Sequence, residues 1–226
     1  MKIIGHRGAR GLAPENTIAG LKKGLEHKVD EVEFDLRVTK DGVVVLHHDR
    51  DLVDPNGKRL SIAGHTYREL QAHKPDLPTL SQALDALKNT VPLYIEVKPG
   101  EPAAPIITAL QTALENGWRA EDFRLASFSF PLLQAFHAAL PDIELIVNER
   151  WSGVRGTFRA RKLGTKRLSI YYLWLWSGFI KATSRRGYKL STYPMNNPVK
   201  ARRWERSGLY AAITDYPDRF ERKTTR

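Results

Sequence analysis

Acidic side chains stand inside two apolar, strand-like runs of the sequence. Glu33 and Asp35 belong to the run VEFDLRV, and Glu96 belongs to PLYIEVK. Side chains alternate along a β-strand, so Glu33 and Asp35 face one side together. Two carboxylates that point the same way repel each other unless a cation lies between them. The pattern therefore predicts a cation beside these strands.

The nature of that cation follows from the available ligands. The chain has no cysteine, which excludes thiolate nucleophiles and Cys-ligated zinc. Three convergent carboxylates favour a hard divalent ion, Mg²⁺ or Ca²⁺, that keeps positions open for water and substrate oxygens. Each acid taken singly could instead be a surface residue or the partner of a nearby Arg or Lys. Their place inside apolar runs favours metal ligation, and we predict Glu33, Asp35 and Glu96 as the ligands.

Histidines and cations follow the predicted strands. His6 ends the first strand, and His47 and His48 follow the strand-like run VVVL. A single histidine at a strand end is usually structural, but two of them near a metal site could act as base and acid in a displacement at phosphorus. Arg7 and Lys98 are donors suited to phosphate, and the guanidinium of Arg7 could hold two oxygens at once.

The elements that must position these residues alternate along the chain. Helical periodicity separates most of the β-rich runs, which is typical of βα units and a parallel sheet. The predicted strands are residues 2–5, 31–38, 43–48, 93–97, 123–127, 143–147, 168–172, 188–192 and 211–214. The predicted helices are residues 17–27, 80–88, 103–116, 131–139, 154–163 and 179–186.

One connection departs from this alternation. Asp41-Gly42 marks a tight turn, so the strands on either side of residues 39–42 should form a hairpin. Without the added hairpin strand, eight strands remain, and we predict a TIM (β/α)8 barrel with catalytic groups at the C-terminal ends of its strands. Residues 49–78 lack clear periodicity and are expected to be a short loop insertion near the top of the barrel.

Length and composition fit a single folded domain over residues 1–226. The start MKIIGHRG turns polar too early for a signal peptide, and no apolar stretch approaches the roughly 20 residues that would span a bilayer. On this basis we expect a soluble, cytoplasmic protein. The sequence leaves the oligomeric state open.

Positive charge is concentrated in the last third of the chain. From Trp151 onward there are 18 Lys and Arg against 4 Asp and Glu, whereas residues 1–150 have 18 against 21. A cationic face of this kind can meet nucleic acid, an anionic membrane or an anionic substrate, or can simply be solvated. The run YYLWLW at residues 171–176 adds aromatic side chains beside these cations. It could contact a membrane interface or pack as an ordinary strand and loop.

Taken together, these motifs resemble those of the glycerophosphodiester phosphodiesterases, a TIM-barrel family related in mechanism to phosphatidylinositol-specific phospholipase C. The resemblance spans nearly the whole chain. Its motifs, in order, are HRG at 6–8, PENT at 14–17, EFD and TKDG within 33–42, HD at 48–49, LPTL at 77–80, IEVKP at 95–99, ASF at 126–128 and TDYPD at 214–218.

The resemblance implies specific roles. His6 and His48 would be the acid/base pair, and Glu33, Asp35 and Glu96 would bind the divalent ion. Arg7 would bind phosphate, Lys98 would lie beside phosphate and metal, and Glu15 would support the site or contact the glycerol end of the substrate. The motif spacing selects His48 over His47, which strand alternation places on the opposite face. Which histidine is acid and which is base stays open.

The chain also departs from the family pattern. Val53-Asp54-Pro55-Asn56 stands where an Arg and two threonines are common in the family. The segment between His48 and Leu77 is also short for the family, which implies a small insertion and a more open cleft. Asn196 is a further candidate near the end of the chain.

The resulting hypothesis is metal-dependent hydrolysis of glycerophosphodiesters to sn-glycerol 3-phosphate and an alcohol such as choline, ethanolamine or glycerol. The alternative that keeps the same site is lysophospholipase D-type cleavage of lysophospholipids at a membrane surface, through peripheral contact of the basic, aromatic last third. Nothing in the sequence resembles a nucleic-acid recognition motif, so no nucleic-acid partner is expected. The preferred head group and the identity of the ion stay open.

Overall fold

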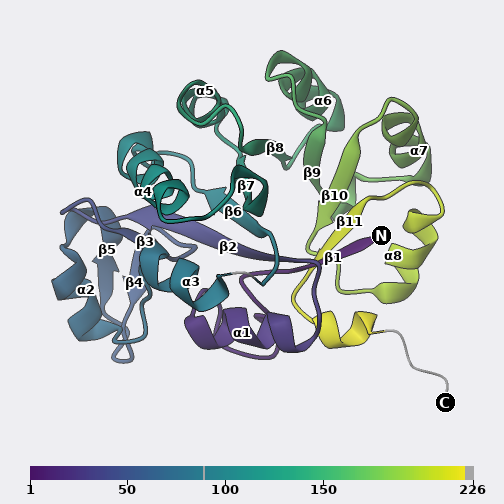
Figure 1. Ribbon diagram of the computed structural model, residues 1–226. Coiled ribbons are helices and arrows are strands. Elements are labelled where there is room, and N and C mark those ends of the chain that lie inside the picture. Colours follow the sequence, from purple (N-terminus) through teal and green to yellow (C-terminus); the bar gives the residue numbers. More distant parts are fainter. Residues whose placement is uncertain (89, 222–226) are drawn as a thin grey trace.

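Eight parallel strands close into a barrel in the computed structural model, which describes residues 1–88 and 90–221 (Figure 1). Strand β1 pairs with both β2 and β11, which closes the sheet. The prediction of a TIM barrel is confirmed. Its strands are β1 (Lys2–Gly5), β2 (Glu31–Val38), β6 (Leu93–Val97), β7 (Phe123–Ser127), β8 (Glu144–Glu149), β9 (Arg167–Tyr171), β10 (Lys189–Tyr193) and β11 (Ala211–Thr214).

Helices follow the barrel strands and surround them (Figure 1). They are α1 (Ile18–Glu26), α3 (Leu80–Leu87), α4 (Ala103–Glu115), α5 (Phe130–Ala139), α6 (Gly153–Lys162), α7 (Ser177–Arg185) and α8 (Pro198–Glu205). All except α8 were predicted, and their ends agree within two residues. Helix α8 was missed because its sequence PVKARRWE buries only Ala201 and Trp204, too few apolar positions to show a helical period. Among the described helices, none has the length and apolar character needed to cross a bilayer.

The connection after β2 contains the predicted hairpin. Strand β3 (Val44–Leu46) pairs antiparallel with β2, with Leu46 opposite Leu36. This strand lies at the outer edge of the sheet and is not one of the eight barrel strands.

Residues 49–78, which we expected to be a short loop insertion, contain regular elements that the sequence pattern did not predict. This segment forms a small two-stranded sheet, β4 (Asp51–Val53) and β5 (Arg59–Ser61), a 3₁₀ turn η1 (Ile62–Gly64) and helix α2 (Tyr67–His73). Strands of three residues and a helix of seven are too short to show periodicity, which is why the pattern was missed. Leu52, Ile62, Leu70 and their neighbours share a separate buried apolar cluster, so the insertion has its own small core.

The barrel interior is layered along its axis. At the N-terminal end of the strands, buried Arg167 forms ion pairs with Glu31 and Glu144. The middle layer is an apolar cluster that includes Ile4 and Tyr94. Tyr94 and Glu96 share one face of β6, so the next layer toward the C-terminal ends is acidic.

Candidate active site

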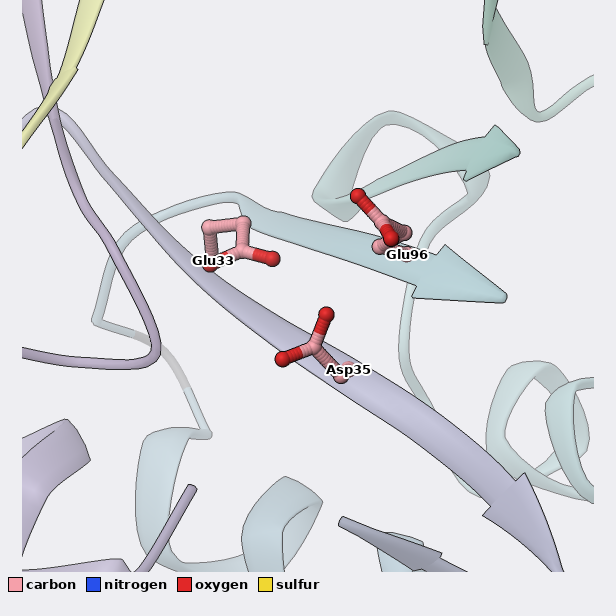
Figure 2. Close-up of side chains that lie close together, drawn as sticks. All are labelled: Glu33, Asp35 and Glu96. Atoms are coloured by element: carbon pink, nitrogen blue, oxygen red, sulfur yellow. The ribbon is translucent and has the colours of Figure 1, made fainter. Parts of the chain in front are cut away.

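Three carboxylates meet inside the C-terminal mouth of the barrel. Glu33 and Asp35 come from β2 and Glu96 comes from the neighbouring β6, where Asp35 and Glu96 are directly opposite each other. Figure 2 shows the three carboxyl groups turned toward a common region. One oxygen from each lies within 4.8 Å of the others. The alternation argument from the sequence is therefore confirmed, and the parallel pairing of β2 and β6 brings the third acid into place.

The surroundings shift the pKa values of two of the three carboxyl groups in opposite directions. Burial, together with the adjacent charges of Asp35 and Glu96, raises the pKa of Glu33 well above its ordinary value. Burial alone would raise the pKa of Asp35 as well, but Lys98 and Arg7 hold it below the usual range. Oxygen ligands from three clustered carboxylates are the donor set that Mg²⁺ and Ca²⁺ prefer, so these residues fit such an ion.

Two basic side chains lie against the acids. The ammonium group of Lys98 is 2.6 Å from Oδ1 of Asp35 and also pairs with Glu96. Nε of Arg7 is 3.1 Å from Oδ2 of Asp35. Arg7 and Lys98 are both buried, so two positive charges lie directly against the acidic cluster.

The segment after β1 is shaped to bring Arg7 over the acids. Arg7 has φ of 50° and Gly8 has φ of 87°, and a Cβ on Gly8 would lie 2.3 Å from the backbone of Gly20 in α1. The loop can therefore pack closely only with glycine at position 8. The backbone N–H of Arg7 donates to Oε2 of Glu33 at 2.7 Å, which orients that carboxylate.

Glu15 acts on the site through Arg7. Its Oε1 accepts a hydrogen bond from Nη1 of Arg7 at 2.7 Å. The Glu15 side chain is 41% exposed, so it lies at the rim of the site and can also meet solvent or substrate.

Two asparagines that were not assigned a role from the sequence hold the acids in place. Nδ2 of Asn16 donates to Asp35 at 2.9 Å, and Asn16 also accepts from the Asp35 backbone N–H. Nδ2 of Asn148 on β8 donates to Oε2 of Glu96 at 2.8 Å. Asn16 belongs to the PENT motif, and this motif could have identified it as a residue of the site. Asn148 stands in an ordinary β-run, ELIVNE, and only the fold reveals its position.

His6 is anchored by the end of the chain. Its Nδ1 lies 2.5 Å from Oδ1 of Asp215, the residue after β11. Asn196 donates to the other oxygen of Asp215 at 2.7 Å and accepts from its backbone N–H. The sequence motif TDYPD contained Asp215 without a role for it, and Asn196 was only a candidate. The structure joins the three residues in one hydrogen-bond network, in which Asn196 contacts Asp215 and Asp215 contacts His6.

His48 and His47 have different surroundings. Nδ1 of His48 lies 2.7 Å from Asp49, and the His48 carbonyl accepts two hydrogen bonds from Arg37 on β2. Burial and the nearby charge of Lys98 lower the pKa of His48, and the charge of Asp35 offsets part of this shift. His47 lies 3.3 Å from the carbonyl of Asp51 in the insertion. Strand β3 ends at Leu46, so both histidines follow the strand, where their rings have different partners.

The arrangement can carry out proton transfer on an anionic substrate. A buried acidic cluster, two cationic donors and two histidines with carboxylate partners surround one mouth. A neutral histidine can accept a proton and a protonated histidine can return it, and the cations can stabilise negative charge on a bound substrate.

Known proteins share this sequence pattern over most of the chain. Residues 6–219 match the model of the glycerophosphoryl diester phosphodiesterase family. The chain is 29% identical to the putative glycerophosphodiester phosphodiesterase YhdW of Bacillus subtilis over 96% of both chains. It is 26% identical to a glycerophosphodiester phosphodiesterase of Caldanaerobacter subterraneus, over 96% of this chain and 94% of that one.

Solved structures agree with the sequence comparison. A phosphodiesterase of Oleispira antarctica, solved in complex with the product sn-glycerol 3-phosphate, superimposes with a TM-score of 0.87. It is 26% identical, and the match covers 97% of this chain and 95% of that chain.

Proposed function

Because the chain belongs to the glycerophosphoryl diester phosphodiesterase family, we propose that it hydrolyses glycerophosphodiesters to sn-glycerol 3-phosphate and an alcohol with the help of Mg²⁺ or Ca²⁺. The observation that carries this proposal is the buried cluster of Glu33, Asp35 and Glu96, whose carboxylates share one region of the barrel mouth. The product bound to the Oleispira relative supports the same substrate class.

Glu33, Asp35 and Glu96 would hold the divalent ion. When bound, such an ion supplies positive charge that polarises phosphoryl oxygens. Asn16 and Asn148 keep two of these carboxylates in fixed orientations by donating hydrogen bonds to Asp35 and Glu96.

Arg7 and Lys98 would bind the phosphate oxygens. Both side chains are already held beside Asp35, so little conformational freedom is lost when substrate arrives. Their positive charges stabilise the additional negative charge that develops on oxygen in the transition state.

His6 and His48 would move the protons. One ring takes the proton of the glycerol hydroxyl next to the phosphodiester. The oxygen of that hydroxyl then bonds to phosphorus. The bond from phosphorus to the alcohol breaks, and the other ring gives its proton to the departing oxygen. Water opens the cyclic phosphate with the two roles exchanged, which returns both rings to their starting states.

The test is divalent-dependent release of choline and sn-glycerol 3-phosphate from glycerophosphocholine. Activity should disappear with a chelator and return with Mg²⁺ or Ca²⁺, and comparison of the two ions identifies the better one. Asp35→Asn should remove activity, whereas Glu115→Gln at the exposed end of α4 serves as the matched control. Wild-type protein that hydrolyses no glycerophosphodiester with either ion would contradict the proposal.

Lysophospholipids are a second candidate substrate, favoured by a path of aromatic rings that leads out of the site. The Tyr193 hydroxyl donates to the carbonyl of Glu149 at 3.1 Å, and the preceding residue, Asn148, donates to Glu96. The Tyr193 and Tyr171 ring centroids are 5.8 Å apart, and Arg150 lies over the rings of both Tyr171 and Trp151. An acyl chain on the substrate could lie along these rings.

This second candidate has its own test. If it holds, Tyr171→Ala should lower turnover of lysophosphatidylcholine more than turnover of glycerophosphocholine. Human lysophospholipase D GDPD1 is 33% identical over 46% of this chain and 34% of its own length, and this partial match supports a lipid substrate. Equal losses on both substrates would leave the aromatic path without a role in lipid selection.

A further inference from the structure

Large apolar side chains that reach solvent are concentrated in three neighbouring connections. Within residues 1–88 and 90–221, nine such side chains are exposed, and seven of them follow β8, β9 or β10. Two of the seven, Val154 and Phe158 on α6, line a cavity of their own. We call the other five the aromatic rim: Trp151, Leu173, Trp174, Trp176 and Val199. Helices α6, α7 and α8, which follow these strands, lie on one side of the barrel (Figure 1).

The side chains of the rim are largely exposed to solvent, although most large apolar side chains of a folded protein are buried. The exposed fractions of Trp151, Leu173 and Trp176 are 61%, 63% and 62%. Trp151 and Trp174 come from different connections, yet their rings meet edge to face with centroids 6.2 Å apart. Grouped apolar side chains on a folded protein mark a surface that meets another molecule, because leaving them in water is costly.

The charge around the rim indicates the kind of molecule. From Trp151 to Trp204 the sequence has 13 Lys and Arg and no Asp or Glu. Lys200 and Arg203 line a cavity of about 460 Å³ together with Trp176 and Val199. Cations and apolar groups therefore border one space, which suits a ligand with a negative group next to an apolar one.

The rim lies at the same end of the barrel as the acidic cluster. All three connections leave the C-terminal ends of barrel strands, and this is the end that holds Glu33, Asp35 and Glu96. A partner on the rim would therefore lie beside the mouth of the site.

We propose that the aromatic rim docks on the surface of an anionic phospholipid bilayer. Tryptophan is favoured at the boundary between head groups and acyl chains, and lysine and arginine nearby bind lipid phosphates. Leu173, Trp174 and Trp176 enter this boundary layer, and Lys200 and Arg203 contact the phosphates. The protein docks peripherally, with the mouth of the barrel facing the lipid.

The first test is co-sedimentation with vesicles of phosphatidylcholine alone or mixed with phosphatidylglycerol. Wild-type protein should bind the mixed vesicles at low salt and bind the neutral vesicles weakly. Tryptophan emission should also shift to shorter wavelength on the mixed vesicles, because Trp174 and Trp176 leave water.

Two sets of variants separate the apolar and the ionic contributions. Leu173→Ser/Trp174→Ser/Trp176→Ser should lower binding by roughly tenfold or more. Lys200→Gln/Arg203→Gln should lower binding to the anionic vesicles by about fivefold for each cation removed.

Matched controls lie in the same basic third but away from the rim. Phe158 is exposed on α6, and its cavity is also lined by Arg161 and Arg186. Phe158→Ser is the apolar control and Arg161→Gln/Arg186→Gln is the charge control, and both should bind vesicles as wild type does. Unchanged melting temperatures show that each variant is folded.

Failure of wild-type protein to bind the mixed vesicles would overturn the proposal, and so would an equal loss of binding in the rim and control variants. Tighter binding to random DNA than to the mixed vesicles, lost in the same rim variants, would assign the rim to nucleic acid instead. Vesicle binding is measured without substrate, so a failed phosphodiesterase assay does not affect this result.

Discussion

Nδ1 of His6 lies 2.5 Å from Oδ1 of Asp215, although 209 residues separate them in the chain. The contact exists because β1 and β11 are neighbours in the closed barrel, with Gly5 opposite Thr214. Burial alone would raise the pKa of Asp215, but hydrogen bonding to His6 keeps it below its ordinary value, so the carboxylate stays charged. A charged acceptor favours the form of His6 that carries its proton on Nδ1, which would leave Nε2 for the proton transfer that we propose for this residue.

Asp215→Asn should therefore weaken catalysis while the protein stays folded. We expect turnover of glycerophosphocholine to fall roughly 10²-fold, because the amide no longer fixes the ring as the carboxylate does. The KM should change less than kcat, and the pH dependence of kcat should move. A loss of melting temperature with an unchanged pH profile would show that Asp215 is only structural.

The two adjacent histidines give a sharp pair of substitutions. His48→Ala should lower activity by about 10²–10⁴-fold, the contribution of one acid/base group. His47→Ala should leave most of the activity, since His47 instead contacts the backbone of the insertion. Initial rates at saturating substrate and metal check this. Greater loss in the His47 variant would reverse the assignment.

Glu33→Gln should have opposite effects on stability and on metal binding. In the absence of metal, three carboxylates within 4.8 Å repel one another, so neutralising one should raise the melting temperature of the metal-free protein. Added Mg²⁺ or Ca²⁺ should stabilise wild type but not this variant. Calorimetric titration of the ion provides a second measurement. A variant that binds the ion as tightly as wild type would exclude Glu33 as a ligand.

Glu149 links the end of β8 to the rim and should make stability depend on pH. Burial alone would raise the pKa of Glu149, but Arg155 and the backbone N–H groups of Arg150 and Trp151 lower it overall. Since the folded-state pKa lies below the unfolded one, this stabilisation is present above the ordinary carboxyl pKa and is lost as pH falls through the folded value.

Glu149→Gln should accordingly lower the free energy of unfolding by roughly 1–3 kcal/mol at neutral pH, because a buried charged hydrogen-bond acceptor is removed. Urea unfolding at neutral and acidic pH measures the difference, which should shrink as the wild-type carboxylate is protonated. Glu115→Gln is the exposed control. A difference that grows toward acidic pH would contradict a lowered pKa of Glu149 in the folded protein.

Local patterns in the sequence were sufficient for much of the fold. The period of two in VEFDLRV and PLYIEVK placed β2 and β6 at their observed bounds and set Glu33, Asp35 and Glu96 on interior faces. Asp41-Gly42 identified the turn of the β2–β3 hairpin. These elements can be predicted from the sequence because each depends only on residues close to one another along the chain.

Short elements with few apolar positions could not be predicted from the sequence. The β4–β5 sheet and α2 stabilise one another through a shared cluster that includes Leu52 and Leu70, so no single segment of 49–78 shows its structure alone. Helix α8 likewise depends on burial of Trp204 against the rest of the molecule.

The amino-acid sequence was enough to identify the chemical groups, the strands that carry them and the family to which they belong. Which of these groups meet depends on the folded barrel. Barrel closure brings Asp215 to His6, parallel pairing sets Glu96 opposite Asp35, and β8 brings Asn148 to Glu96. The fold also gathers Trp151 and Trp174 on one rim. These contacts join residues far apart in the chain, and their geometry depends on the whole closed sheet rather than on any local pattern.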